Sequence, residues 1–184
     1  MESLVAKITV REFFDMELEE GFQYELIDGE IVKKSAPNPQ HQFVLGELYF
    51  SLKNYLKNKS YGIVFFAPID VFFDAYNNTQ PDLVYVSESK KGIITQNGIE
   101  GVPDLIIEIL SPSTFRLDRG AKMKLYKYHA VAEYWLVEPT SQTVEVYAYA
   151  NGDYDLHDAA VETGIISSKL LSDWQVNLQE LFKR

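Results

Sequence analysis

Cysteine is absent from this chain of 184 residues. The sequence therefore excludes a disulfide framework, a thiolate zinc site, an iron–sulfur cluster and a cysteine nucleophile, and any chemistry must come from oxygen and nitrogen groups. A chain without disulfides suits a reducing compartment, so we expect a cytoplasmic protein.

Long hydrophobic runs are absent as well. No segment approaches the roughly 20 consecutive apolar residues that a membrane-spanning helix needs. The N-terminal region, which contains Lys7 and Arg11, has no continuous apolar stretch of the kind that marks a signal peptide. We therefore expect neither a membrane protein nor export by that route.

Basic residues are scarce, because 17 Lys and Arg stand against 27 Asp and Glu and give a net charge of −10. This charge disfavours a protein that coats nucleic acid by bulk attraction, so any nucleic acid must be bound locally. The chain does contain 46% hydrophobic and 14% aromatic residues, a composition typical of a globular protein. At this length we expect one domain spanning residues 1–184.

The N-terminal part predicts two helices on either side of a hairpin. Thr9 and Glu12 have the spacing of a capping box, which predicts a short helix ending near Gly21. The dipeptide Asp28-Gly29 between two apolar runs is typical of a tight hairpin turn. After a proline-containing break at residues 35–39, apolar residues recur at helical spacing over residues 43–56.

The remaining apolar runs predict mainly strands. We expect these at residues 63–66, 69–73, 83–86, 105–110, 132–137 and 144–149, with a loop at 87–101. Helices are expected at about residues 118–128 and 178–182. This order predicts an α/β (α+β) protein with a mixed sheet flanked by helices.

One carboxylate interrupts the apolar strand predicted at residues 105–110. Glu108, if buried and ionised there, needs a cationic partner. In one interpretation it forms a structural salt bridge with Lys122 or an arginine. In the other, Asp82 and Glu108 meet at one end of the sheet and supply hard oxygen ligands for Mg²⁺ or Mn²⁺, with Lys122 beside them. Composition and spacing leave both interpretations open.

The basic residues are concentrated directly after this strand. Residues 116–127 contain five Lys or Arg and one Asp, which gives a local charge of +5 − 1 = +4. A phosphodiester substrate would be held at such a segment, with Arg119 and Lys124 as candidate phosphate contacts. A solvated helix face accounts for individual lysines here as well.

Several short motifs also occur in a specific order between about residues 20 and 150. They are YELIDGE at 24–30, His41, APIDV at 67–71, QPD at 80–82, EILSPS at 108–113, Lys122 with Tyr126, and EYW at 133–135. In this order they resemble the restriction-endonuclease-like family of the PD-(D/E)XK nuclease superfamily. The resemblance implies a restriction-endonuclease-like fold and metal-dependent hydrolysis of DNA phosphodiester bonds.

The resemblance also implies a catalytic centre. Asp82, Glu108 and the carbonyl of Ile109 would hold Mg²⁺ or Mn²⁺, and Lys122 would assist the attack of water. Leu110 stands where the superfamily's usual triplet has its lysine, so Lys122 from the following helix would take that part.

Further residues match the family around this centre. Glu25 corresponds to an N-terminal glutamate that approaches the same cluster, although a hairpin salt bridge explains it nearly as well. Ser111 would contact the nucleic acid. Three further residues would line the pocket or orient the metal ligands rather than act as catalysts: His41, Asp70 and Tyr126.

Two other functions stay open. A protein of the same ancestry that binds nucleic acid or a protein partner without cutting it fits the net charge and the displaced lysine. A glycosidase with paired carboxylates such as Glu25 and Glu108 is the second. The resemblance further implies a homodimer, because two copies suit the cutting of two antiparallel DNA strands.

Overall fold

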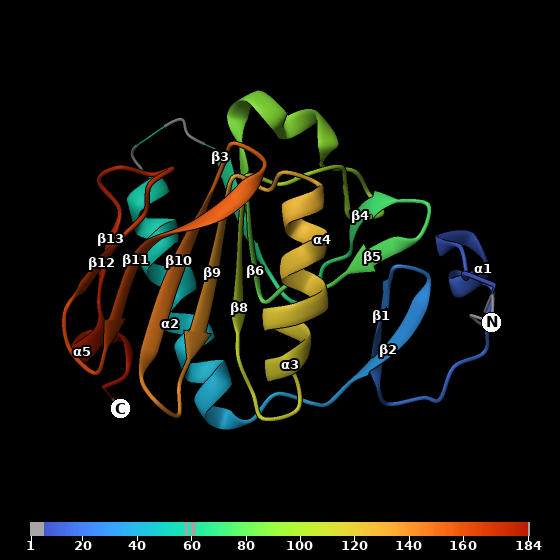
Figure 1. Ribbon diagram of the computed structural model, residues 1–184, viewed down its shortest axis with the longest axis horizontal. Coiled ribbons are helices and arrows are strands. Elements are labelled where there is room, and N and C mark those ends of the chain that lie inside the picture. The colour runs from blue at the N-terminus through green and yellow to red at the C-terminus, as the bar shows by residue number, and fades with distance from the viewer. Residues whose placement is uncertain (1–5, 58, 60–61, 184) are drawn as a thin grey trace.

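The centre of the molecule is a mixed six-stranded sheet. The structure, a computed structural model, describes residues 6–57, 59 and 62–183. The strand order is β11-β10-β9-β8-β6-β3 (Figure 1). β8 and β9 run parallel and the other neighbours run antiparallel, which confirms the predicted mixed sheet. The strands are β3 Gly62–Phe66, β6 Leu83–Ser87, β8 Leu105–Ile109, β9 Glu133–Glu138, β10 Thr143–Ala150 and β11 Asp153–Val161.

Helices cover both faces of this sheet (Figure 1). Helix α2, Pro39–Leu56, packs on one face, where its Leu48 shares a core with Ile107 and Ile109 of β8. A continuous helical stretch covers the other face, made of α3 Phe115–Leu117, a π-helix at Asp118–Lys122 and α4 Met123–Tyr128. Ile106 packs on that second side. Because side chains alternate along a strand, Glu108 also points toward α4.

A second sheet lies beside α4 (Figure 1). Its order is β2-β1-β5-β4-β7, formed by β1 Gln23–Ile27, β2 Glu30–Lys34, β4 Val71–Asp74, β5 Asn77–Thr79 and β7 Ile99–Glu100. The predicted hairpin is confirmed, with Asp28 and Gly29 at φ of 52° and 76°. Gly29 also has no room for a side chain, since a Cβ there would lie 2.6 Å from Lys7 Cβ.

The C-terminal segment closes the core on the α2 side. It forms β12 Ile165–Ser167, β13 Gln175–Asn177 and α5 Leu178–Leu181. Trp174 stacks on Trp135 of β9 with ring centroids 4.7 Å apart. The buried carboxylate of Glu133 accepts hydrogen bonds from the Trp135 indole, the Ser168 hydroxyl and two backbone N–H groups at residues 169 and 170. This carboxylate therefore fixes the segment that follows β12.

Some predicted elements differ in extent from the observed ones. Helix α1 covers only Val10–Phe14, because its backbone ends at an Asp15 cap and Phe14 stays exposed. Helix α2 begins earlier than predicted, with Pro39 as its first residue and Asn38 accepting a hydrogen bond from His41 N. The segment predicted as a loop at 87–101 contains a 3₁₀ helix, η1 Glu88–Ile93, and β7. No helix within the described residues is long and apolar enough to cross a membrane.

Candidate active site

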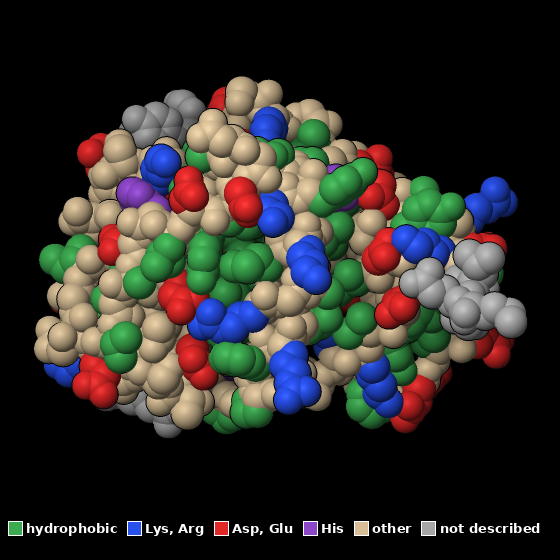
Figure 2. Space-filling view, viewed as in Figure 1, with side chains coloured by type: hydrophobic (Ala, Val, Ile, Leu, Met, Phe, Trp, Pro, Cys, Tyr) green, Lys and Arg blue, Asp and Glu red, His purple; other side chains and the backbone are tan. Residues whose placement is uncertain are grey.

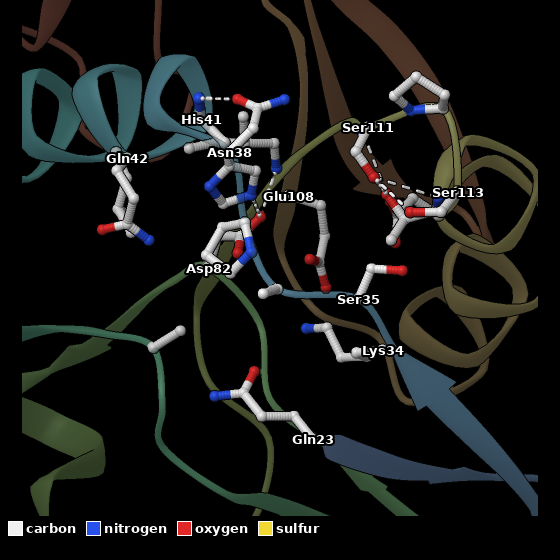
Figure 3. Close-up of a pocket in the computed structure, with 18 of the residues that line it drawn as sticks. Gln23, Lys34, Ser35, Asn38, His41, Gln42, Asp82, Glu108, Ser111 and Ser113 are labelled. Carbon is white, nitrogen blue, oxygen red and sulfur yellow. Dashed lines mark hydrogen bonds and ion pairs between the residues drawn. The ribbon is translucent and has the colours of Figure 1, made fainter. Parts of the chain in front are cut away.

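A cavity of ≈ 320 Å³ opens beside the first turn of α2 and the loop that follows β8 (Figure 3). Asp82, Glu108, Ile109 and Lys122 line it together with His41. Its acids are recessed, since Asp82 is 7% and Glu108 only 2% exposed. The two predicted acids and the predicted lysine therefore meet at one cavity.

The register of β6 and β8 explains why the two acids meet. These strands are antiparallel, with Leu83 opposite Ile107, so one further step sets Asp82 opposite Glu108. Residues directly opposite each other in an antiparallel pair project from the same face of the sheet. The backbone N–H of Ile109 donates to Asp82 Oδ2 at 2.7 Å and fixes that carboxylate at the end of β8.

Asp82 is stabilised as an anion. His41 Nε2 lies 3.1 Å from Asp82 Oδ2 (Figure 3). Burial raises the pKa of Asp82, but the hydrogen bond and charge of His41, the charge of Lys34 and the Ile109 N–H together outweigh it and lower the pKa. Asp82 is therefore ionised at neutral pH, with the His41 ring in direct contact with its carboxylate.

Glu108 has the opposite tendency. Burial raises the pKa of Glu108 to about 8; Lys122 opposes the shift, and the charges of Asp118 and Asp82 add to it. Lys122 Nζ and the Tyr126 hydroxyl both donate to Glu108 Oε1, each at 2.8 Å. At neutral pH the Glu108 carboxyl consequently holds a proton unless a further cation approaches it.

Lys122 is the centre of a buried ionic cluster. Besides Glu108, its Nζ lies 3.0 Å from Glu25 Oε1 and 3.6 Å from Asp118 Oδ1. Burial disfavours the charged ammonium, but these three carboxylates outweigh it and raise the pKa of Lys122 well above its ordinary value. The salt bridge that the sequence suggested is thus present, and it lies within the cavity wall.

Glu25 belongs to the cluster but not to the cavity lining. Its Oε1 accepts a hydrogen bond from Gln80 N at 2.7 Å and lies 3.4 Å from Lys34 Nζ. Gln80 in turn donates from its amide to Asp70 Oδ1, which is how Asp70 connects to the site. Since Glu25 is completely buried and shares Lys122 with Glu108, the two carboxylates do not flank a space for a sugar. The geometry therefore disfavours a glycosidase.

The charges of the cluster do not balance. It contains the carboxyl groups of Glu25, Asp82, Glu108 and Asp118 and the ammonium groups of Lys34 and Lys122, so full ionisation gives −4 + 2 = −2 with His41 left out. One divalent cation would offset this charge. No group of three or more His, Cys, Asp or Glu side chains arranged for a metal occurs in the part of the chain that the structure describes. Two carboxylates and one backbone carbonyl nevertheless fit Mg²⁺, which usually keeps several waters.

The predicted phosphate contacts are not brought to this cavity. Arg119 forms an ion pair with Glu145 at 2.7 Å, and Lys124 lines a separate cavity beside Asp28 and Tyr128. Figure 2 shows Lys and Arg side chains over α3 and α4 with acidic side chains close by. Ser111 does lie at the cavity, and its hydroxyl is 3.0 Å from that of Ser113 (Figure 3).

The mouth of the cavity is uncharged. All of its exposed lining residues are neutral, and Lys34 and Lys122 are the cationic side chains deeper in the lining. The exposed ones are Gln23, Ser35, Ala36, Pro37, Asn38, Gln42, Pro68, Pro112 and Ser113. A ligand therefore meets amide and hydroxyl groups before it meets charge.

Sequence reasoning missed three members of the cluster: Asp118, Lys34 and Gln80. Asp118 stands four residues before Lys122, a spacing that places both on one side of a helix and could have been used. Lys34 lies diagonally across the hairpin from Glu25, in a register that pairs Gln23 with Lys34. Gln80 contributes its backbone N–H, which no sequence pattern would have revealed.

The fold places the protein in a known class. The structure resembles a crystal structure described as a putative nuclease belonging to DUF820 from Anabaena variabilis, with a TM-score of 0.74 and 23% identity over 95% of this chain and 97% of that one. The mixed sheet flanked by helices is therefore the predicted architecture, and it matches that of a nuclease-like structure.

The chain belongs to the Uma2 family, described as "Putative restriction endonuclease", which residues 10–179 match. It is also 27% identical over 150 residues to an uncharacterized protein of Synechocystis sp., covering 81% of this chain and 77% of that one. Family and fold together support a nuclease-like function.

Proposed function

We propose that this protein hydrolyses phosphodiester bonds of DNA with the help of Mg²⁺ or Mn²⁺. The observation that carries the proposal is the juxtaposition of Asp82 and Glu108 at one recessed cavity, in a cluster whose carboxyl groups outnumber its ammonium groups. Phosphodiester hydrolysis places additional negative charge at the reacting phosphate, which such a site can stabilise only with a cation present.

Each residue of the site has a part in this reaction. Asp82, Glu108 and the Ile109 carbonyl would hold the divalent cation, which lowers the pKa of a bound water and offsets charge on the phosphoryl oxygens. His41 orients Asp82, and Tyr126 orients Glu108. Lys122 and Ser111 line the same cavity. Lys122 would assist the attack of water, and Ser111 would contact the DNA strand.

Cleavage assays with single substitutions test the proposal. Asp82→Ala and Glu108→Ala should each reduce the Mn²⁺-dependent cleavage of DNA by on the order of 100-fold or more, because each removes a charge that supports the transition state. Asp153→Asn, which removes an exposed partner of Lys127, is the matched control and should cleave like the parent. Equal cleavage by all four proteins at saturating Mn²⁺ would refute the assignment.

A second candidate is a module of this fold that binds nucleic acid or a protein partner without cutting it. The uncharged mouth and the ion pairs of the basic segment favour it. Calorimetric titration with Mg²⁺ or Mn²⁺ separates the two candidates, because the nuclease must bind the ion through Asp82 and Glu108 and the binding module need not. The homodimer stays a prediction that sedimentation velocity at micromolar concentration tests.

A further inference from the structure

Asp118 is a buried acid at the cavity that the reaction described above does not use. It is 1% exposed and lies at the start of the π-helix Asp118–Lys122, whose last residue is Lys122. Single π-helical turns inside longer helices occur frequently at functional sites. The residues between the two ends are less buried, so this turn directs Asp118 and Lys122 inward together.

The three carboxylates around Lys122 differ in their other contacts. Glu108 Oε1 also accepts from Tyr126, and Glu25 Oε1 also accepts from Gln80 N. Asp118 Oδ1 accepts no hydrogen bond from any described residue, although it is buried and 3.6 Å from Lys122 Nζ. This oxygen therefore interacts with the ammonium alone among the described contacts.

Asp118 is itself held firmly. Its N–H donates to the Thr114 carbonyl at 2.9 Å, and its own carbonyl accepts from the Tyr134 hydroxyl at 3.0 Å. The backbone of Asp118 is therefore fixed, while burial raises the pKa of its carboxyl group and the charge of Lys122 opposes that shift.

The direction in which Asp118 pulls the ammonium is set by the cavity. Glu25 lies behind the lining, whereas Asp118 and Glu108 both line the cavity. Under the proposed function Glu108 is also a ligand of the cation, and its Oε1 already accepts from the Tyr126 hydroxyl, so Glu108 does not serve the ammonium alone. Asp118 is then the carboxylate that keeps the ammonium on the cavity side.

We propose that Asp118 is a positioning residue that holds the Lys122 ammonium at the cavity, where it can face the reacting phosphate. The effect of Asp118 on catalysis rests on the proposed nuclease function. The position of the Lys122 ammonium can be measured whether or not the protein is a nuclease.

The test combines kinetics with a direct signal from Lys122. Asp118→Asn keeps the shape of the side chain and removes its charge, so kcat should fall on the order of 10-fold or more while KM changes by less than about twofold. The ammonium protons of Lys122, observed by ¹⁵N nuclear magnetic resonance and assigned by their loss in Lys122→Arg, should exchange with water faster in the variant. Asp118→Glu restores the charge and should recover most of kcat and the slow exchange.

The controls separate positioning from packing. Asp153→Asn should change neither readout, since Asp153 pairs with Lys127 at the surface. If Asp118→Asn retains the parental kcat and exchange rate, or if Asp118→Glu is as impaired as Asp118→Asn, the proposal is wrong. If Asp118→Asn does not fold, Asp118→Ser, which also removes the charge, takes its place in both measurements and should likewise accelerate exchange. Absence of cleavage in the parent would refute the proposed function, while the exchange rates would still decide the part of Asp118.

Discussion

At neutral pH the ionic state of the site depends on the proton that Glu108 holds. Its neighbour Asp82 is kept ionised by His41, Lys34 and the Ile109 N–H, despite burial. The pKa of Glu108 is raised to about 8, chiefly by burial. A cation that binds between these acids must therefore displace a proton from Glu108, so its affinity should increase as the pH rises toward that value.

This proton also affects stability. The native pKa of Glu108 is about 8 and its ordinary value is 4.5, so between these values the native state binds a proton that the unfolded chain has released. The free energy of unfolding should consequently decrease as the pH rises through this window. Glu108→Gln cannot titrate, so its stability relative to the parent should increase from pH 5 to pH 8, by up to about 1.4 kcal/mol per pH unit.

Urea denaturation with a chelator present measures this difference. Asp153→Asn is the control, because Asp153 is exposed and its lowered pKa places its titration below the window. Parallel stability curves for Glu108→Gln and the parent from pH 5 to pH 8 would show that Glu108 is ionised throughout.

Among the elements, β9 connects the centre of the large sheet to the C-terminal segment. Its first residue, Glu133, is completely buried and receives four hydrogen bonds, three of them from residues 168–170. The carboxylate thus replaces the regular backbone pairing that this segment lacks. Trp174 packs against Trp135 in the same region.

Glu133→Ala should destabilise this region strongly. The substitution leaves buried donors without an acceptor, at a cost of about 1–3 kcal/mol for each unsatisfied group. The free energy of unfolding should fall by about 3 kcal/mol or more, and amide exchange at residues 168–171 should accelerate most. Gln at this position retains one acceptor oxygen and should be less harmful. Uniform acceleration across the molecule would contradict a local anchoring role.

The sequence predicted the elements that have strong apolar patterns and missed those without them. The strand around Glu108 and the hairpin at Asp28-Gly29 were predicted because burial on both faces and a tight turn leave clear patterns. β5 consists of Asn77, Asn78 and Thr79, which are buried but polar, so no alternation of apolar residues predicts this strand. β11 is largely exposed and lacks alternation for the opposite reason.

The candidate site was predictable to a similar extent. Asp82, Glu108 and Lys122 were found because an isolated acid in an apolar strand requires a partner and because the motifs resemble a family. The positions of Arg119 and Lys124 depend on which face of the helix meets the sheet and on distant acids such as Glu145. A local count of charge gives no information on the orientation of the helix or on the distant acids.

On the scale of the whole molecule, the charges are distributed unlike those of a protein that grips DNA electrostatically. The net charge is −10, the basic segment forms ion pairs with acids such as Glu145 and Asp153, and the exposed mouth of the cavity is neutral. Binding at the cavity should therefore depend on short-range contacts more than on phosphate neutralisation.

The salt dependence of DNA binding checks this expectation. Each phosphate neutralised on duplex DNA contributes about −0.9 to the slope of log K against log salt. With Lys34 and Lys122 as the cations in the cavity lining, we expect a slope of about −2 or shallower. Fluorescence anisotropy of labelled DNA with the Glu108→Gln protein, at constant Mg²⁺, measures it. A slope near −5 would place the binding surface on the basic side chains over α3 and α4 instead.

The ammonium of Lys122 joins Glu25 from the five-stranded sheet to Glu108 from the six-stranded one. These two acids are separated by much of the chain, and the lysine follows both of them. A nascent polypeptide therefore has no assembled centre until residue 122 has emerged and the two sheets have docked. Under the proposed function, a chain that ends before residue 122 would therefore lack the lysine that assists hydrolysis.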